Sequence, residues 1–238
     1  IQSLSIKQLS LPRLTRETLY SRVYSELREL LMDAKVAPGD EFSIRQLAAA
    51  LGTSTQPVRE AVRHLVAENA LELLPNRAVR VPLMTQHRYE ELARLRCVLE
   101  GLAAREAATN ITPEELETVR RTEREHFEIA SNPRVSLEAL HRVNKSFYFA
   151  IYTAARMPSV MPMIESLWLQ VGPMLNLVLD ERYRSQAHYP KLDENLGQLT
   201  AMVAALSDRD GILLRTLLES RIQATARFVI EFHLVAAD

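Results

Sequence analysis

The side chains best suited to chemistry are arginines near the start of a predicted helix over residues 55–69. The apolar residues of this segment recur at helical spacing and share one face: Val58, Ala61, Val62 and Leu65. Gln56, Arg59 and Arg63 lie on the opposite face. Guanidinium and amide groups near an exposed helix N-terminus can pair with guanine and adenine edges in the major groove. The pattern favours a DNA-reading helix, although Arg59 and Arg63 could equally be ordinary solvated residues.

No catalytic motif accompanies this helix. The phosphate-loop patterns GxGxxG and GxxxxGK[ST] do not occur, and neither do HExxH and GxSxG. The single cysteine, Cys97, excludes an internal disulfide framework and a Cys-rich zinc site, and it fits a reducing cytoplasm. The six histidines show no paired ligand spacing, so we predict surface or packing roles for them.

Composition narrows the class of protein further. The 238 residues are 47% hydrophobic and 25% charged, the balance of a globular chain, and 6 glycines in that length favour helix. No apolar run approaches the roughly 18 residues that a membrane span needs. The net charge of −1 means that nucleic-acid binding must come from a local patch. Candidate members of that patch are Arg45, Arg59, Arg63, Arg77 and Arg80.

The elements before residue 84 predict a winged helix-turn-helix. Residues 1–14 have no period and are interpreted as an arm. Three helices follow. The first begins at Thr15, the second covers residues 44–52 and the third covers residues 55–69, with a short Gly-bearing turn between the last two. The runs LELLP and NRAVRVPL flank a polar turn at residues 75–77 and predict a hairpin. We therefore expect a DNA-binding domain over residues 15–83.

This segment resembles the DNA-binding domain of the GntR family of bacterial transcription regulators. The PG turn, the LAAALG helix, the PVREAV motif and the PNR wing match in order and spacing. The resemblance implies a homodimer that binds a palindromic double-stranded DNA operator. It assigns DNA contacts to the matching positions Arg45, Ser54, Arg59 and Arg77.

Three positions depart from the family pattern, and one of them is Ala78, where the family has a wing glycine. The family usually has Ser-Arg-Thr before this motif, where this chain has Ser54, Thr55 and Gln56. Thr55 thus replaces an arginine that reads a base, and Gln56 replaces a threonine that touches DNA, so the family's consensus operator is not carried over. The DNA-binding residues that we predict are Arg45, Ser54, Thr55, Gln56, Arg59, Arg63 and Arg77.

Residues 84–238 predict an all-α domain for effector binding and dimerisation. Helix breaks delimit six helices, roughly 85–109, 113–130, 136–155, 158–183, 187–207 and 209–236. Pro162 and Pro173 are candidate breaks in the fourth. ELARLRCVLEGLAAREAA and ALSDRDGILLRTLLESRI resemble the opening and closing helices of the FCD ligand-sensing domain of the FadR subfamily. With six helices rather than seven, this domain resembles the VanR-type branch of that subfamily. The expected fold class is mainly α, a winged helix-turn-helix followed by a helical bundle.

The resemblance also bears on metal. Many FCD domains hold a divalent metal with one Asp and three His, and the matching positions are Asn144, Tyr148, Leu199 and Arg221. An amide, a phenol, an aliphatic chain and a guanidinium cannot form an imidazole–carboxylate site. We therefore predict no metal and no cofactor.

Two arginines on apolar helix faces suggest an anion instead. Arg96 lies on a face with Leu92, Leu95, Leu99 and Ala103. Arg221 lies on the apolar face of the last helix. A buried charge without a partner costs several kcal/mol, so each arginine needs an anion. The anion is either an internal carboxylate such as Glu100 or an effector bound in the fork geometry of arginine.

These observations predict the function of the chain. We predict a cytoplasmic transcription regulator, a repressor released from its operator by a small anionic metabolite such as a carboxylate. The effector would contact Arg96, Asn144, Tyr148, Leu199 and Arg221, although Asn144 and Tyr148 could be satisfied polar residues at a bundle edge. The alternatives are a metal-dependent FCD sensor and a small-molecule-binding enzyme with a DNA-binding appendage.

Overall fold

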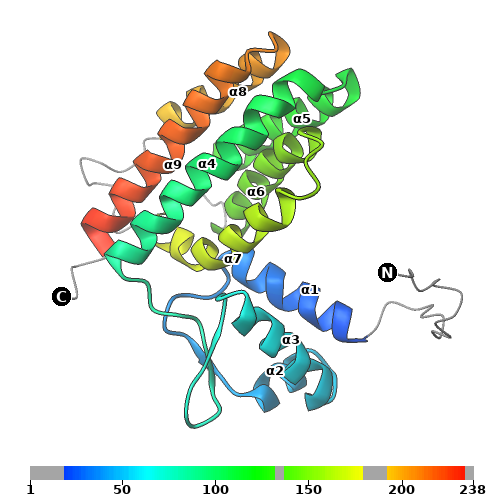
Figure 1. Cartoon of the computed structure of the whole chain (residues 1–238), viewed down its shortest axis with the longest axis vertical. Coiled ribbons are helices and arrows are strands. Elements are labelled where there is room, and N and C mark those ends of the chain that lie inside the picture. Colours follow the sequence, from blue (N-terminus) through cyan, green and yellow to red (C-terminus); the bar gives the residue numbers. More distant parts are fainter. Residues whose placement is uncertain (1–18, 132–136, 179–191, 234–238) are drawn as a thin grey trace, which may run out of the picture.

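The computed structural model describes residues 19–131, 137–178 and 192–233 (Figure 1). The predicted arm over residues 1–14 lies outside them. The described chain is mainly helical, with a winged helix-turn-helix followed by a helical bundle. The elements of the first part are α1 (Leu19–Met32), β1 (Glu41–Phe42), α2 (Ile44–Ala50), α3 (Thr55–Ala67), β2 (Glu72–Leu73) and β3 (Val79–Arg80).

Local sequence explains the helices of the winged domain. On α1, Val23, Leu27 and Leu31 are buried, because residues four apart lie on one face. At the start of α2, Ser43 Oγ accepts a hydrogen bond from the backbone N–H of Gln46 at 3.1 Å. The Gln46 side chain accepts one from the Ser43 N–H at 2.8 Å, which completes a capping box. Ser43 is therefore the N-cap of α2.

The wing contains one strand more than the predicted hairpin. Strands β2 and β3 form that hairpin, and β1 adds to its other edge, giving an antiparallel sheet of order β1-β3-β2. In this register Arg80 lies opposite both Glu41 and Glu72. Its guanidinium is 2.6 Å from a Glu72 oxygen and 4.0 Å from a Glu41 oxygen. Arg80 is therefore neutralised within the sheet and does not belong to a free basic patch.

Six helices form the bundle within the described ranges. They are α4 (Gln86–Asn110), α5 (Pro113–Ala130), α6 (Leu137–Ala154), α7 (Met161–Val178), α8 (Leu192–Ser207) and α9 (Gly211–His233). α4 runs along α9 and also contacts α6 and α7 (Figure 1). Pro162 falls in the first turn of α7, where a missing N–H costs little, and Pro173 is accommodated within it. The predicted split of this helix is therefore wrong, and its predicted extension to residue 183 lies outside the described residues.

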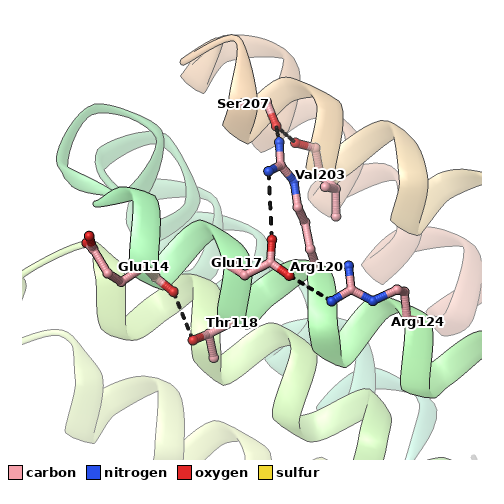
Figure 2. Close-up of polar contacts among 7 residues, drawn as sticks. All are labelled: Glu114, Glu117, Thr118, Arg120, Arg124, Val203 and Ser207. Carbon is pink, nitrogen blue, oxygen red and sulfur yellow. Dashed lines mark hydrogen bonds and ion pairs between the residues drawn. The ribbon is translucent and has the colours of Figure 1, made fainter.

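An exposed polar network fastens α5 to the end of α8 (Figure 2). Arg120 donates a hydrogen bond to Ser207 Oγ at 3.1 Å, and Glu117 accepts one from Arg124 at 2.7 Å. The other face of α5 is buried through Val119, Thr122 and His126. Of the helices in the described ranges, none combines the length and apolarity needed to cross a bilayer.

Candidate functional site

The predicted DNA-reading face of α3 is exposed. Val58, Ala61, Val62 and Leu65 are at most 1% exposed, so they fix the helix on the domain core. The polar residues of the opposite face are exposed: Thr55, Gln56, Arg59 and Arg63. Within the described residues the guanidiniums of Arg59 and Arg63 make no hydrogen bond or ion pair. Their donors therefore remain available to an anionic partner.

The residues around the start of α3 fit the same surface. Ser54 occupies the N-cap position, but its hydroxyl makes no capping hydrogen bond, which leaves it free for an external acceptor. Arg45, on α2, is exposed as well. Gln56 Nε2 donates to Glu60 Oε1 at 2.7 Å, so one amide donor of Gln56 is already engaged.

The wing presents a single free arginine at its tip. Arg77 is exposed and has a φ of 65°, in the left-handed region. Its backbone N–H donates to the Leu74 carbonyl at 2.8 Å, and Asn76 Oδ1 accepts from the N–H of Ala78 at 2.9 Å. These bonds hold the turn in a conformation that is unusual for a residue other than glycine. Arg77 therefore lies at the exposed tip of a turn with a defined backbone.

Inside the bundle, Arg96 already has an anionic partner. Its Nε donates to Glu100 Oε1 at 2.7 Å, and Glu100 is 0% exposed. The Tyr152 hydroxyl donates to the other Glu100 oxygen at 2.5 Å. The internal pair that the sequence allowed is the one formed, because residues four apart on a helix meet. Of the two anions that the sequence left open for Arg96, the structure shows the internal carboxylate, and a contact of Arg96 with an effector stays a prediction.

A second group of buried and half-buried side chains surrounds Tyr148. The Arg221 guanidinium lies 5.9 Å from the centre of the Tyr148 ring, and the Trp168 ring lies 6.0 Å from it. Arg221 also donates to Gln198 Oε1 at 3.4 Å, a long hydrogen bond. Asn144 precedes Tyr148 by one helical turn on α6 and shares its face.

This second group, which we call the Tyr148 cluster, contains buried polar atoms without hydrogen-bond partners. They are His126 Nδ1, Asn144 Oδ1, the Tyr148 hydroxyl and Trp168 Nε1. Buried polar groups in folded proteins almost always have partners, because an unmade hydrogen bond costs about 1–3 kcal/mol. Four such atoms, on α5, α6 and α7, form a set of donors and acceptors suited to a polar ligand.

Burial controls the charge states in the Tyr148 cluster. Burial, together with the smaller effect of the nearby positive charge of Arg221, lowers the pKa of His126 to about 4. Burial also raises the pKa of Tyr148. At neutral pH His126 and Tyr148 are therefore uncharged, and the positive charge of this cluster comes from Arg221.

The remaining predicted site residues have plainer surroundings. Leu199 is 0% exposed and belongs to the apolar core. Leu95, predicted to share the buried face of Arg96, is 43% exposed. In the parts of the chain that the structure describes, no group of three or more His, Cys, Asp or Glu side chains could hold a metal ion. The absence of a metal stays a prediction.

Two members of the Tyr148 cluster were not predicted from sequence. His126 belongs to the charged run RRTEREHFE, which suggests a solvated face, yet it is 4% exposed. Its position four residues after Thr122 on the inward stripe of α5 was the available signal. Trp168, the only tryptophan, is 1% exposed within an apolar stretch that gives no sign of a polar neighbour.

Comparison with known proteins assigns both parts of the chain. Residues 19–81 match the family model described as "Bacterial regulatory proteins, gntR family", and residues 91–224 match the model of the FCD domain. A winged helix followed by this bundle defines a class of DNA-binding transcription regulators. The chain belongs to the GntR family, in the branch that carries an FCD domain. Membership of a family of regulators decides against the enzyme alternative.

Individual relatives agree with this assignment. The HTH-type transcriptional regulator McbR of Escherichia coli (strain K12) is 33% identical over 194 residues, covering 81% of this chain and 84% of McbR. The HTH-type transcriptional repressor RspR of the same strain is 24% identical over 208 residues, 87% of each chain. The solved structure of E. coli McbR/YncC has a TM-score of 0.81 at 28% identity, covering 91% of this chain and 99% of that one.

Proposed function

We propose that the chain is a homodimeric, cytoplasmic repressor that a small anionic metabolite releases from a palindromic operator. Residues 15–83 would form the DNA-binding domain, and residues 84–238 the domain for effector binding and dimerisation. The relative RspR carries the name of a transcriptional repressor, which supports the sign of regulation.

DNA recognition rests on the exposed face of α3. Arg59 and Arg63 would reach base edges or phosphates in the major groove. Arg45, Ser54 and Arg77 would contact the sugar-phosphate backbone of the DNA on either side of that groove. Thr55 and Gln56 occupy the remaining positions at the helix start. Because a Gln56 amide donor is engaged by Glu60, we expect Gln56 to make one contact rather than a bidentate pair with adenine.

Exposed apolar side chains support a dimer. Leu95 and Val98 lie on one face of α4 and are 43% and 60% exposed, while Ile212 on α9 is 76% exposed. α4 and α9 run side by side on one side of the bundle (Figure 1). Exposed large apolar side chains can mark interaction sites, and two copies meeting through α4 and α9 would pair the two α3 helices with the half-sites of a palindrome.

The effector site rests on one observation, the four unpartnered polar atoms of the Tyr148 cluster. A carboxylate would accept hydrogen bonds from Trp168 Nε1 and the Tyr148 hydroxyl, with the positive field of Arg221 favouring its charged form. A hydroxyl or similar group on the same molecule would satisfy His126 and Asn144. Since Arg96 is balanced by Glu100, its contribution would be to hold Trp168, whose ring centre lies 5.2 Å from its guanidinium.

DNA binding is tested with duplexes that the wild-type protein selects from a random-sequence library. Arg59→Ala should weaken binding to the selected duplex by about 1–3 kcal/mol in a mobility-shift titration. Arg124→Ala is the matched control, because Arg124 is also exposed but lies on α5, in the bundle. An Arg59→Ala dimer that binds as tightly as the control would remove Arg59 from the interface.

Effector binding is tested by thermal-shift screening of small carboxylic acids beside their neutral amides. A ligand that binds only the folded state raises the melting temperature, so acids should stabilise the wild type and the amides should not. Arg221→Met should lose this response while keeping affinity for the selected duplex, and Arg124→Met should retain it. Stabilisation of the wild type by neutral compounds alone would reject an anionic effector.

A further inference from the structure

Helix α1 packs against the exposed DNA-reading helix α3, which we call the recognition helix, and also against the bundle. On its winged side, the Tyr24 hydroxyl donates to Glu68 Oε1 at 2.7 Å, and the Tyr24 ring stacks on His64 of α3 at 4.6 Å between centroids. On its other side, α1 lies against α7 (Figure 1). Buried apolar side chains of both domains form one continuous cluster that includes Leu27, Val62 and Trp168. α1 is thus shared between the two domains.

The backbones of α1 and α7 approach each other closely at Gly172, which is buried in α7. A methyl group on Gly172 would stand 2.4 Å from the Leu31 carbonyl oxygen and 3.1 Å from Met32 Cα. Both neighbours are backbone atoms of α1 and its end, so they cannot move aside as a flexible side chain could. Only glycine at this position lets α1 and α7 approach so closely.

Ion pairs hold α1 in place on both sides of this contact. Arg28 of α1 donates to Glu165 of α7 at 2.8 Å. At the other end, Asp33 has a side chain that is 7% exposed and pairs with Lys145 of α6. Lys35 lies 3.7 Å from Asp33. Buried and flanking pairs of this kind have a defined geometry, so they fix the position of α1 on α6 and α7.

The same helix α7 carries Trp168 of the Tyr148 cluster, one turn before Gly172. We propose that the contact between Gly172 and the Leu31 backbone couples the Tyr148 cluster to the recognition helix through α1. The inference rests on the proposed effector site. A ligand that shifts α7 moves α1 at this contact, and α1 moves α3 through Tyr24.

Coupling is reciprocal, so it can be measured from the DNA side without any effector. Trp168 is the sole tryptophan, and its fluorescence reports on α7. We expect the selected duplex to change Trp168 fluorescence in the wild type. Gly172→Ala, folded by circular dichroism, should still bind the duplex but lose most of this change. Gly197→Ala is the matched control: it also adds a methyl group to a bundle helix, and nothing lies within 4 Å of that methyl.

Each outcome decides a different question. A duplex that binds wild type without changing Trp168 fluorescence, or that changes it equally in Gly172→Ala, overturns the coupling while the proposed function stands. Failure of the wild type to select any duplex overturns the proposed function itself. Should Gly172→Ala not fold, Arg28→Gln carries the same test, because it removes the adjacent pair with Glu165. A reduced fluorescence change is then expected, and an unreduced change overturns the coupling.

Discussion

Replacing Glu100 with glutamine tests whether the buried ion pair holds the bundle together. The substitution keeps the size of the side chain and one carbonyl oxygen, so it removes little besides the negative charge. Arg96, whose side chain is 9% exposed, then has no anion within the pair that it forms in the wild type. Breaking a buried pair from one side costs about 3–5 kcal/mol, because the remaining charge stays buried. Glu100→Gln should therefore destabilise the bundle by about that amount.

Denaturant unfolding followed by Trp168 fluorescence measures this effect where it arises, because the indole lies beside Arg96. The matched control is Glu117→Gln, which removes an ion pair whose carboxylate side chain is 57% exposed and should change the midpoint little. Adding Arg96→Met to Glu100→Gln removes the uncompensated charge and should restore much of the loss. A Glu100→Gln midpoint no lower than that of the control, or no recovery in the double variant, would refute the reasoning.

Three further predictions concern pH, metal and a helix cap. Burial lowers the pKa of His126 and of His141 from 6.5 to about 4, so the folded state binds fewer protons than the unfolded state. The free energy of unfolding should therefore be highest above pH 6.5 and fall as the pH decreases toward 4. A double variant, His126→Gln with His141→Gln, should lose much of this decrease when it is melted across the same pH range. Elemental analysis of the purified protein should find no stoichiometric zinc, nickel or manganese, and one tightly bound metal per chain would contradict the reading of Asn144 and Tyr148. In urea unfolding, Ser43→Ala should lower the stability of the winged domain by about 1 kcal/mol, because it removes the capping box. Ser54→Ala should lower it less, because Ser54 makes no capping hydrogen bond.

Most of the fold follows from local sequence, because helices are encoded by spacing and end signals. The cap at Ser43 and the proline at the first position of α5 mark helix starts without tertiary information. Strand β1 was missed because two residues carry no period, and it forms only because β3 offers a free edge. Pro173 suggested a break in α7, but a bundle helix surrounded by packed neighbours absorbs the lost hydrogen bond.

The site could be predicted only where it depends on one helix. The exposed face of α3 and the possible pairing of Arg96 with Glu100 are both visible at helical spacing. The Tyr148 cluster brings together side chains from α5, α6, α7 and α9, and no local pattern shows that His126 and Arg221 come near each other. The contact of Gly172 with Leu31 is similarly hidden, since it joins backbones far apart in the chain.

The neutralisation of Arg80 has a consequence for how the protein tolerates changing ionic strength. Each phosphate that an arginine contacts releases counterions and adds about 0.9 to the dependence of log affinity on log salt. Arg80 forms ion pairs with Glu72 and Glu41, and Arg28 forms an ion pair with Glu165. Neither displaces ions from DNA. The salt dependence of operator binding should therefore be shallower than a count of arginines in the winged domain implies, so occupancy of the operator would change less when a cell gains or loses salt.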